Sequence, residues 1–191
     1  MKIRGVLIVV CAVLLAACGA GSPSTSGSTS ATSSSNNDGW TNFSSDKGQF
    51  TVRMPSEPKQ STQSVDTAAG KIDVALFTAV AGNTAYVASY SDYPEAVMAG
   101  ADPLKVLEGA MNGAVTNIGG TLIDSKDVSL NDVPGKEFSA NGKIANQGEG
   151  SMRGRLYLVK NRLYQLIVVG LKDQLPTADV DKYLQSFKLT K

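Results

Sequence analysis

Residues 151–170 read SMRGRLYLVKNRLYQLIVVG and consist of two strand-like runs separated by Lys160 and Asn161. Two such runs joined by two residues predict a β-hairpin, and Asn is suited to the positive φ that a tight turn requires. The segment LYQLIVV at 163–169 is apolar on both faces, which is typical of a strand covered on both sides. We therefore predict strands over 151–159 and 162–170 and place the second strand centrally in a sheet.

Further strands are predicted where apolar and polar residues alternate along the chain. Pro55 ends the first of them, because Pro cannot donate a hydrogen bond to a sheet ladder. Gly70 is expected at the tip of a hairpin. The predicted strands cover 50–54, the two arms of 60–80, 84–91, 121–130 and 136–140, the last after a turn at Val133-Pro134-Gly135.

Two amphipathic helices complete the prediction. The first begins at Asp102 as N-cap with Pro103 in the first turn and ends at Gly119-Gly120, and the second begins at Thr177. About seven strands and two main helices indicate an α+β fold in which an antiparallel sheet of six to seven strands is flanked by the helices. The residues expected to face the core are Leu104, Leu107, Met111, Val115 and Ile118 in the first helix and Val180, Tyr183, Leu184 and Phe187 in the second.

The N-terminus has the architecture of a secretory signal, with two positive residues followed by an apolar run of about eleven residues. That run is too short to span a membrane. The stretch Leu15-Ala16-Ala17-Cys18-Gly19 comes next and resembles the lipobox of bacterial lipoproteins. The resemblance implies cleavage before Cys18 and attachment of a diacylglycerol, with acyl chains such as palmitate, to its sulfur. The alternative is an ordinary secretory signal in which Cys18 is incidental.

Three segments are expected: a signal peptide at 1–17, a lipidated Cys with a disordered tether at 18–38, and one α+β domain at 39–191. The tether is rich in Ser, Thr and Gly and is too polar to form a core. Membrane attachment through Cys18 places the protein in the cell envelope. Gly19 in second place resembles lipoproteins of the outer membrane, which face the periplasm in a diderm bacterium.

Composition excludes several classes of function. The chain has no His, so catalysis by Ser-His-Asp or Cys-His and the usual zinc sites cannot be built. The net charge is +1 and there is no long basic run, which argues against a nucleic-acid partner. We therefore expect a protein that is not an enzyme and that has no cofactor and no bound metal.

Several short segments of the domain resemble PsbP-like domains, whose superfamily also contains Mog-type Ran-binding proteins and some bacterial lipoproteins. The resemblance extends from about Trp40 to Leu189, and none of its elements is catalytic. It implies an antiparallel sheet flanked by helices and used for docking to other proteins. The segments that carry it are FTVRMP at 50–55 with EPK at 57–59, YSDYP at 90–94, VPGKEF at 133–138, RLYL at 155–158 and SFKL at 186–189.

Two groups of residues are candidate binding residues. On the last hairpin, Arg153, Arg155 and Tyr157 share a face that could meet anionic lipid or an acidic partner, with a plain solvated sheet face as the alternative. After the strand at 84–91, three carboxylates could hold Ca²⁺, with solvated surface charge as the alternative. The candidates from this second segment are Tyr90, Asp92 and Tyr93, and the carboxylates are Asp92, Glu95 and Asp102.

Two functions remain open. The first is a membrane-anchored, non-catalytic module that docks to an envelope protein or helps an assembly to form. The second is an extracytoplasmic carrier of a small molecule or lipid, whose apolar pocket would lie between the sheet and the first helix. The side chains expected to line that pocket are Tyr86, Tyr90, Leu107 and Met111. Trp40, next to the tether, is interpreted as the start of the core.

Overall fold

The computed structural model describes residues 31–35, 38–67, 70–144 and 148–190. The predicted signal peptide, Cys18 and most of the predicted tether lie outside these residues. No helix within the described ranges is long and apolar enough to cross a membrane.

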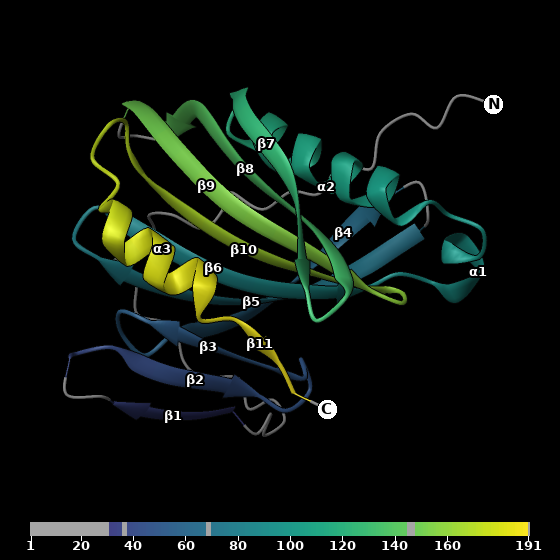
Figure 1. The fold of residues 1–191 in the computed structure, drawn as a ribbon, viewed down its shortest axis with the longest axis horizontal. Helices are drawn as coiled ribbons and strands as arrows, with labels where there is room; N and C mark the ends of the chain where they lie inside the picture. The colour runs from purple at the N-terminus through teal and green to yellow at the C-terminus, as the bar shows by residue number, and fades with distance from the viewer. Residues whose placement is uncertain (1–30, 36–37, 68–69, 145–147, 191) are drawn as a thin grey trace.

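The described residues form three layers (Figure 1). A seven-stranded antiparallel sheet, in the order β4-β5-β6-β10-β9-β8-β7, lies in the middle. Helix α2 covers one face, while α3 and a four-stranded sheet, in the order β1-β2-β3-β11, cover the other. The strands are β1 Ala31–Ser35, β2 Thr41–Ser45, β3 Phe50–Met54, β4 Lys59–Thr67, β5 Gly70–Ala81, β6 Thr84–Asp92, β7 Thr121–Leu130, β8 Val133–Ile144, β9 Gly148–Val159, β10 Arg162–Leu171 and β11 Lys188–Leu189, and the helices are α1 Glu95–Met98, α2 Pro103–Asn117 and α3 Thr177–Gln185.

The predicted hairpin at 151–170 is present as β9 and β10, and β10 is the central strand of the seven. Both faces of β10 are buried, which confirms the interpretation of its two-sided apolar sequence. The turn differs in one detail, because the positive φ of 55° belongs to Lys160 rather than to Asn161. Asn161 instead anchors the next loop: its carbonyl accepts from the Tyr93 N–H at 2.9 Å and its amide donates to the Tyr93 carbonyl at 2.8 Å.

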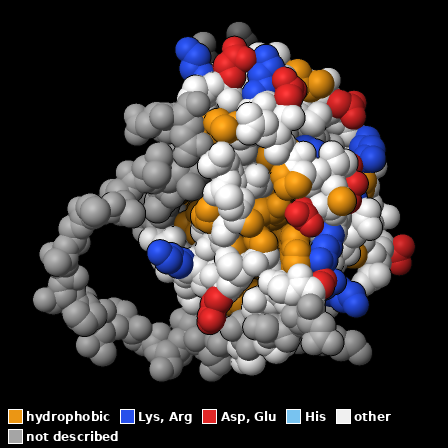
Figure 2. Space-filling model, turned by 90° about the vertical axis from the view of Figure 1, so that its left-hand side faces the viewer, with side chains coloured by type: hydrophobic (Ala, Val, Ile, Leu, Met, Phe, Trp, Pro, Cys, Tyr) orange, Lys and Arg blue, Asp and Glu red, His pale blue; other side chains and the backbone are white. Residues whose placement is uncertain are grey.

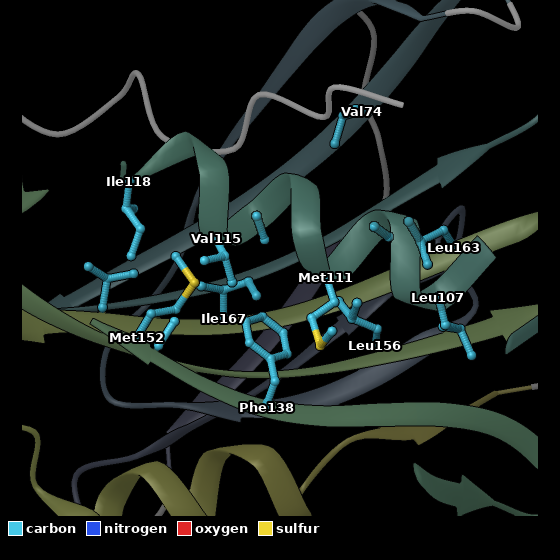
Figure 3. Packing of buried hydrophobic residues seen from close by; sticks show 14 of the residues in the cluster. Val74, Leu107, Met111, Val115, Ile118, Phe138, Met152, Leu156, Leu163 and Ile167 are labelled. Carbon is cyan, nitrogen blue, oxygen red and sulfur yellow. The ribbon is translucent and has the colours of Figure 1, made fainter. Parts of the chain in front are cut away.

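Two separate apolar cores lie on the two faces of the large sheet. The first lies under α2, where Leu107, Met111 and Val115 point toward the sheet (Figure 3). The second lies between the sheets and under α3, and it contains Phe50, Tyr86, Tyr183 and Phe187 among others. Trp40 is buried in this second core, as predicted. The large sheet lies between the two cores, so the side chains on one face of the sheet do not contact the core on the other face.

Both predicted helices are confirmed, but one residue that was predicted to face the core is exposed. The Asp102 carboxylate accepts from the Leu104 N–H at 3.0 Å, which is the expected N-cap bond, and α2 ends before Gly119, whose φ is 54°. Leu104 was predicted to face the core, but it is 46% exposed. It lies in the first turn of α2, directly after Pro103.

Two strand predictions need correction. Phe50–Met54 is a strand, but it belongs to the small sheet rather than to the main one. The turn expected at Val133-Pro134-Gly135 occurs two residues earlier, at Asn131 and Asp132, whose φ values are 49° and 66°. Asn and Asp tolerate the left-handed region that a two-residue hairpin turn requires, so the turn forms there and β8 begins at Val133.

The predicted disordered tether is wrong at its C-terminal end. Ala31–Ser35 forms β1, which pairs in antiparallel register with Thr41–Ser45. The outer edge of β2 offers unpaired backbone groups, and a Ser- and Thr-rich segment can pair with them without needing a core. Asp38, which follows, forms ion pairs with Arg53 and Lys182 at 2.6 Å each.

Candidate functional site

A polar, charged surface crosses β7, β8 and β9 on the side of the large sheet that α3 partly covers. Antiparallel pairing aligns its residues in two rows of direct cross-strand partners, and α3 adds one carboxylate from the side. Residues on one face of a strand recur every second position, so both rows share a face. The residues that we call the ionic face are Asp124, Ser139 and Arg153, then Lys126, Glu137 and Arg155, and finally Asp181.

Glu137 is the centre of the ionic face and is only 8% exposed. Its carboxylate accepts from Arg155 Nε at 2.5 Å, and Lys126 Nζ lies 3.2 Å from its other oxygen. Arg153 Nη2 is 3.7 Å from that same oxygen. Burial by itself raises the pKa of Glu137, but the hydrogen bonds from Arg155 and Lys126 outweigh it, so the pKa is lowered from its ordinary value. Glu137 is therefore ionised at neutral pH.

Both arginines also bind α3. Arg153 Nη1 donates to Asp181 Oδ1 at 2.9 Å, and Arg155 Nη1 donates to the Leu184 carbonyl at 3.3 Å. We predicted that this face could meet anionic lipid or an acidic partner, but the side chains of Arg153 and Arg155 are only 29% and 21% exposed and each already pairs with a carboxylate of the protein. The face carries three cations and three anions, so it has no excess of positive charge for anionic lipid.

A hollow of about 60 Å³ opens between the two rows. It is much smaller than the pockets of about 300 Å³ or more that hold drug-sized ligands. Its small size and polar lining suit the ends of a few side chains of a partner protein rather than a whole small molecule. The residues that line it are Asp124, Lys126, Glu137, Phe138, Ser139 and Arg153.

Tyr90 and Asp92 belong to a different arrangement, at the end of β6. Arg162 donates two hydrogen bonds to the Asp92 carboxylate, at 2.6 and 2.7 Å, and one to the Lys47 carbonyl at 2.9 Å. Its guanidinium lies 4.8 Å from the centre of the Tyr90 ring. The hydrogen bond to Asp92 is the main reason why the pKa of Arg162 is raised. These contacts hold the turn before β3 against the large sheet.

Tyr93 and Tyr157, the other two tyrosines among the candidates, are core residues. Tyr157 is 3% exposed and stacks on Phe187, with ring centroids 5.7 Å apart and planes at 5°. Tyr93 is 5% exposed, lies in the core under α2, and burial raises its pKa to about 12. The structure thus brings Arg153 and Arg155 together, places Tyr90 and Asp92 around Arg162, and buries Tyr93 and Tyr157. Cys18 lies outside the described residues.

The three carboxylates proposed for Ca²⁺ have separate roles. Asp92 binds Arg162, Asp102 caps α2, and Glu95 lies in the first turn of α1. Among the described residues, no three acidic or Cys side chains are grouped so that they could hold a metal ion.

The prediction of a single carrier pocket is also wrong. Tyr86 lies in the core between the sheets, where Tyr90 packs as well, whereas Leu107 and Met111 lie in the core under α2. Since the sheet separates the two pairs, they cannot line one cavity.

Sequence reasoning missed Glu137, Lys126, Asp124 and Asp181 as members of the ionic face. Each is an ordinary charged residue. The order and register of β7, β8 and β9 bring the first three together, and the packing of α3 beside β9 adds Asp181. One signal was present in β8, where Glu137 and Ser139 alternate with the apolar Phe138 and Ala140 in the period-two pattern of a strand.

Comparison with known proteins supports the fold. No family model matches the chain, and no curated protein matches it. Cyanobacterial PsbP (CyanoP) from Synechocystis sp. PCC 6803 is similar in structure, with a TM-score of 0.51 at 13% sequence identity, over 88% of this chain and 98% of that chain. PA94 from Pseudomonas aeruginosa, described as a protein of unknown function and putative regulator, has a TM-score of 0.38 at 8% identity, over 78% of this chain and 88% of that chain. The likeness to CyanoP shows that the chain has a PsbP-like fold.

Proposed function

We propose that this chain is a non-catalytic docking module of the cell envelope, which is anchored to the membrane through lipidated Cys18 and binds a protein partner with the ionic face. The observation that carries the proposal is the network around Glu137: three cations meet one buried carboxylate, and the sheet face that holds them is left partly open by α3.

Charge complementarity on such a surface gives specificity for a partner. Arginines held in place by ion pairs are pre-organised, so they lose little side-chain entropy when a partner arrives. Lys126 is 62% exposed at its side chain, so one cation of the network reaches solvent.

The balance of charges favours a protein as the partner. Three cations and three anions on one face offer alternating charge, which a protein surface can complement and a uniformly anionic membrane cannot. On the face that Figure 2 shows, charges of both signs are interspersed around apolar side chains. In this proposal the lipid on Cys18 therefore binds the membrane, and the ionic face binds the protein partner.

The test is site-specific photo-crosslinking in the source cells. A photoreactive residue at exposed position 124 should yield a crosslinked protein, and the same residue at position 105, on the far side of the sheet, should not. Lys126→Glu should abolish the crosslink from position 124, whereas Lys105→Glu, an exposed charge reversal on α2, should leave it unchanged. Equal crosslinking from both positions, or an unchanged adduct in Lys126→Glu, would refute docking through the ionic face.

A further inference from the structure

An apolar segment projects from one end of the molecule, between β6 and the start of α2, and it contains helix α1 (Figure 1). Residues 94–104 read PEAVMAGADPL and contain no Lys or Arg. Single exposed apolar residues are ordinary, but a contiguous group of them marks a contact with another molecule or with a membrane. Val97 and Leu104 are both 46% exposed. The exposed apolar residues of the segment, which we call the apolar tip, are Pro94, Ala96, Val97, Ala99, Pro103 and Leu104.

The segment that carries the apolar tip is fixed to the rest of the domain. Tyr93, directly before it, is buried in the core under α2 and forms two hydrogen bonds with Asn161, of 2.9 and 2.8 Å. Met98, within the segment, packs against the same core. These contacts hold the segment in place while the side chains of the apolar tip stay in solvent.

The backbone of α1 suits an apolar surrounding. A backbone N–H without a partner is costly where no water can reach it. The N–H groups of Val97 and Met98 both donate to the Pro94 carbonyl, at 2.9 and 3.3 Å. Ala99 donates to the Glu95 carbonyl at 2.9 Å, and Pro94 has no N–H to satisfy. This turn therefore carries much of its own hydrogen bonding with it when it leaves water.

The apolar tip lies at the end of the molecule where β1 begins. Ala31, the first residue of β1, pairs with Ser45. The turn that follows presents the Lys47 carbonyl to Arg162 at 2.9 Å. Arg162 is in turn the register partner of Asp92, two residues before the tip. These contacts lead from the start of β1 to the start of the tip, so both lie at one end of the described domain.

The chain between the proposed lipid and β1 is long enough for the tip to reach the bilayer that holds the lipid. Ala31 follows Cys18 by 13 residues, which span at most about 45 Å. The end of the domain that carries the apolar tip is therefore kept close to the membrane surface.

The small size of the apolar tip favours a membrane over a protein as its occupant. A stable protein interface buries about 800 Å² on each partner. The two large side chains of the tip are Val97 and Leu104, each about half covered, and its other members are Ala and Pro. A shallow apolar contact with the headgroup region of a bilayer needs neither such an area nor a matching surface.

We propose that the apolar tip enters the headgroup region of the lipid bilayer and orients the domain on it, an inference that rests on the proposed anchor at Cys18. Val159, at the end of β9, pairs with Arg162 and so lies at the end of the molecule that carries the tip. Arg155 and Arg153 of the ionic face precede Val159 by four and six residues, which places them about 13 and 20 Å along the strand. The ionic face therefore stands above the bilayer, where a protein partner can reach it.

The experiment measures how deeply single positions of the lipidated protein enter a bilayer. The mature protein is purified with its lipid, reconstituted into phosphatidylcholine vesicles, and labelled with a nitrobenzoxadiazole fluorophore at one introduced Cys. Phosphatidylcholine is used because residues 94–104 include two acidic side chains and no cation, so anionic lipid would not attract them. The tip positions are Val97→Cys and Leu104→Cys, and the controls are Val80→Cys and Ile123→Cys, whose native residues are 52% and 61% exposed outside the tip.

We expect brominated phosphatidylcholine to quench the fluorophore at positions 97 and 104 but not at the controls. Iodide in the water should quench it at least about threefold less at position 97 than at position 80, because apolar segments at an interface are buried about 5–10 Å. Equal quenching at the two positions would overturn the proposal. A fluorophore at position 97 that is shielded from iodide but not quenched by brominated lipid would also overturn it, because a protein or a second copy would then cover the tip.

Flotation of the same vesicles separates this proposal from the proposed anchor. Protein that floats with the vesicles but shows equal quenching at tip and control positions refutes the role of the tip alone. Protein that does not float refutes the anchor, and the role of the tip with it.

A charge reversal of environment at the tip provides the matched variant. With the fluorophore at position 104, Val97→Asp should lower the quenching by brominated lipid about twofold, because a carboxylate resists leaving water. Val80→Asp, an equally exposed change near the far end of β5, should leave the quenching unchanged. Both variants should keep the melting temperature of the parent, since neither side chain is part of a core. Equal quenching in the two variants would contradict insertion of the tip.

Discussion

Arg162 and Asp92 are joined by two parallel hydrogen bonds, of 2.6 and 2.7 Å, at the point where β10 and β6 meet in register. The same guanidinium reaches the Lys47 carbonyl, which belongs to the turn between β2 and β3. One side chain therefore connects the central strand of the large sheet with the small sheet.

Replacing this arginine should loosen the small sheet. Arg162→Lys keeps the charge but loses the two-pronged geometry, and we expect a loss of about 1 kcal/mol in the free energy of unfolding. Arg162→Ala should cost about 2 kcal/mol, because the bond to the Lys47 carbonyl and the contact with the Tyr90 ring are lost as well. Urea denaturation followed by fluorescence of Trp40 measures both, and equal stability of the two variants would contradict the role assigned to the geometry.

Replacing the buried Glu137 of the ionic face should destabilise the protein more than replacing the exposed Asp181. Glu137→Gln leaves Arg155 without a charged acceptor in a half-buried place, which we expect to cost about 2 kcal/mol. Asp181→Asn, whose side chain is 41% exposed, should cost less than about 1 kcal/mol. Chemical denaturation at pH 7 tests the ranking, and a larger effect at Asp181 would show that Glu137 is not the centre of the network.

The same carboxylate predicts a pH dependence. The pKa of Glu137 is lower in the folded protein than in the unfolded chain, so its contribution is fully present above the unfolded value of about 4.5. That contribution is lost as the pH falls through the folded pKa. The difference in unfolding free energy between the wild type and Glu137→Gln should therefore shrink when the pH is lowered from 6 to 3. A difference that stays constant or grows would mean that the pKa is not lowered.

Gly135 should tolerate no side chain. A Cβ at this position would lie 2.5 Å from the Tyr157 ring and 2.6 Å from the Leu156 carbonyl oxygen. The ring is held from its other side by stacking on Phe187, so it cannot yield easily. We expect Gly135→Ala to cost about 2 kcal/mol. Gly109→Ala is the control: it lies within α2 with open space around it, and Ala there should stabilise the protein by about 0.5–1 kcal/mol. Thermal unfolding of the two variants should shift in opposite directions.

The proposed lipid anchor makes a prediction of its own. Cys18→Ala should abolish incorporation of labelled palmitate and leave the precursor uncleaved or the protein released from membranes, since we propose its sulfur as the attachment point. Fractionation of cells grown with labelled fatty acid provides the measurement. Normal labelling and membrane retention of the variant would show that Cys18 is not the lipid attachment point.

Local patterns in the sequence were sufficient for the strands of the large sheet, for the two main helices and for the centre of that sheet. The two-sided apolar run at 163–169 predicted a central strand, and β10 is that strand, because only a strand covered on both faces can bury such a run. Asp102 and Pro103 predicted the start of α2, because capping depends on neighbouring residues alone.

What the sequence could not decide is which layer each buried face meets and which charges meet each other. Phe50–Met54 alternates in the same way whether it joins the main sheet or a second one, and Arg153 and Arg155 look like free cations until β8 places Glu137 between them. Alternation records only that one face of a strand is buried, whereas pairing between residues far apart in the chain depends on strand order and register. Those are set by the packing of all the layers together, and so only the tertiary structure decided the ionic face and placed the apolar tip at the end where β1 begins.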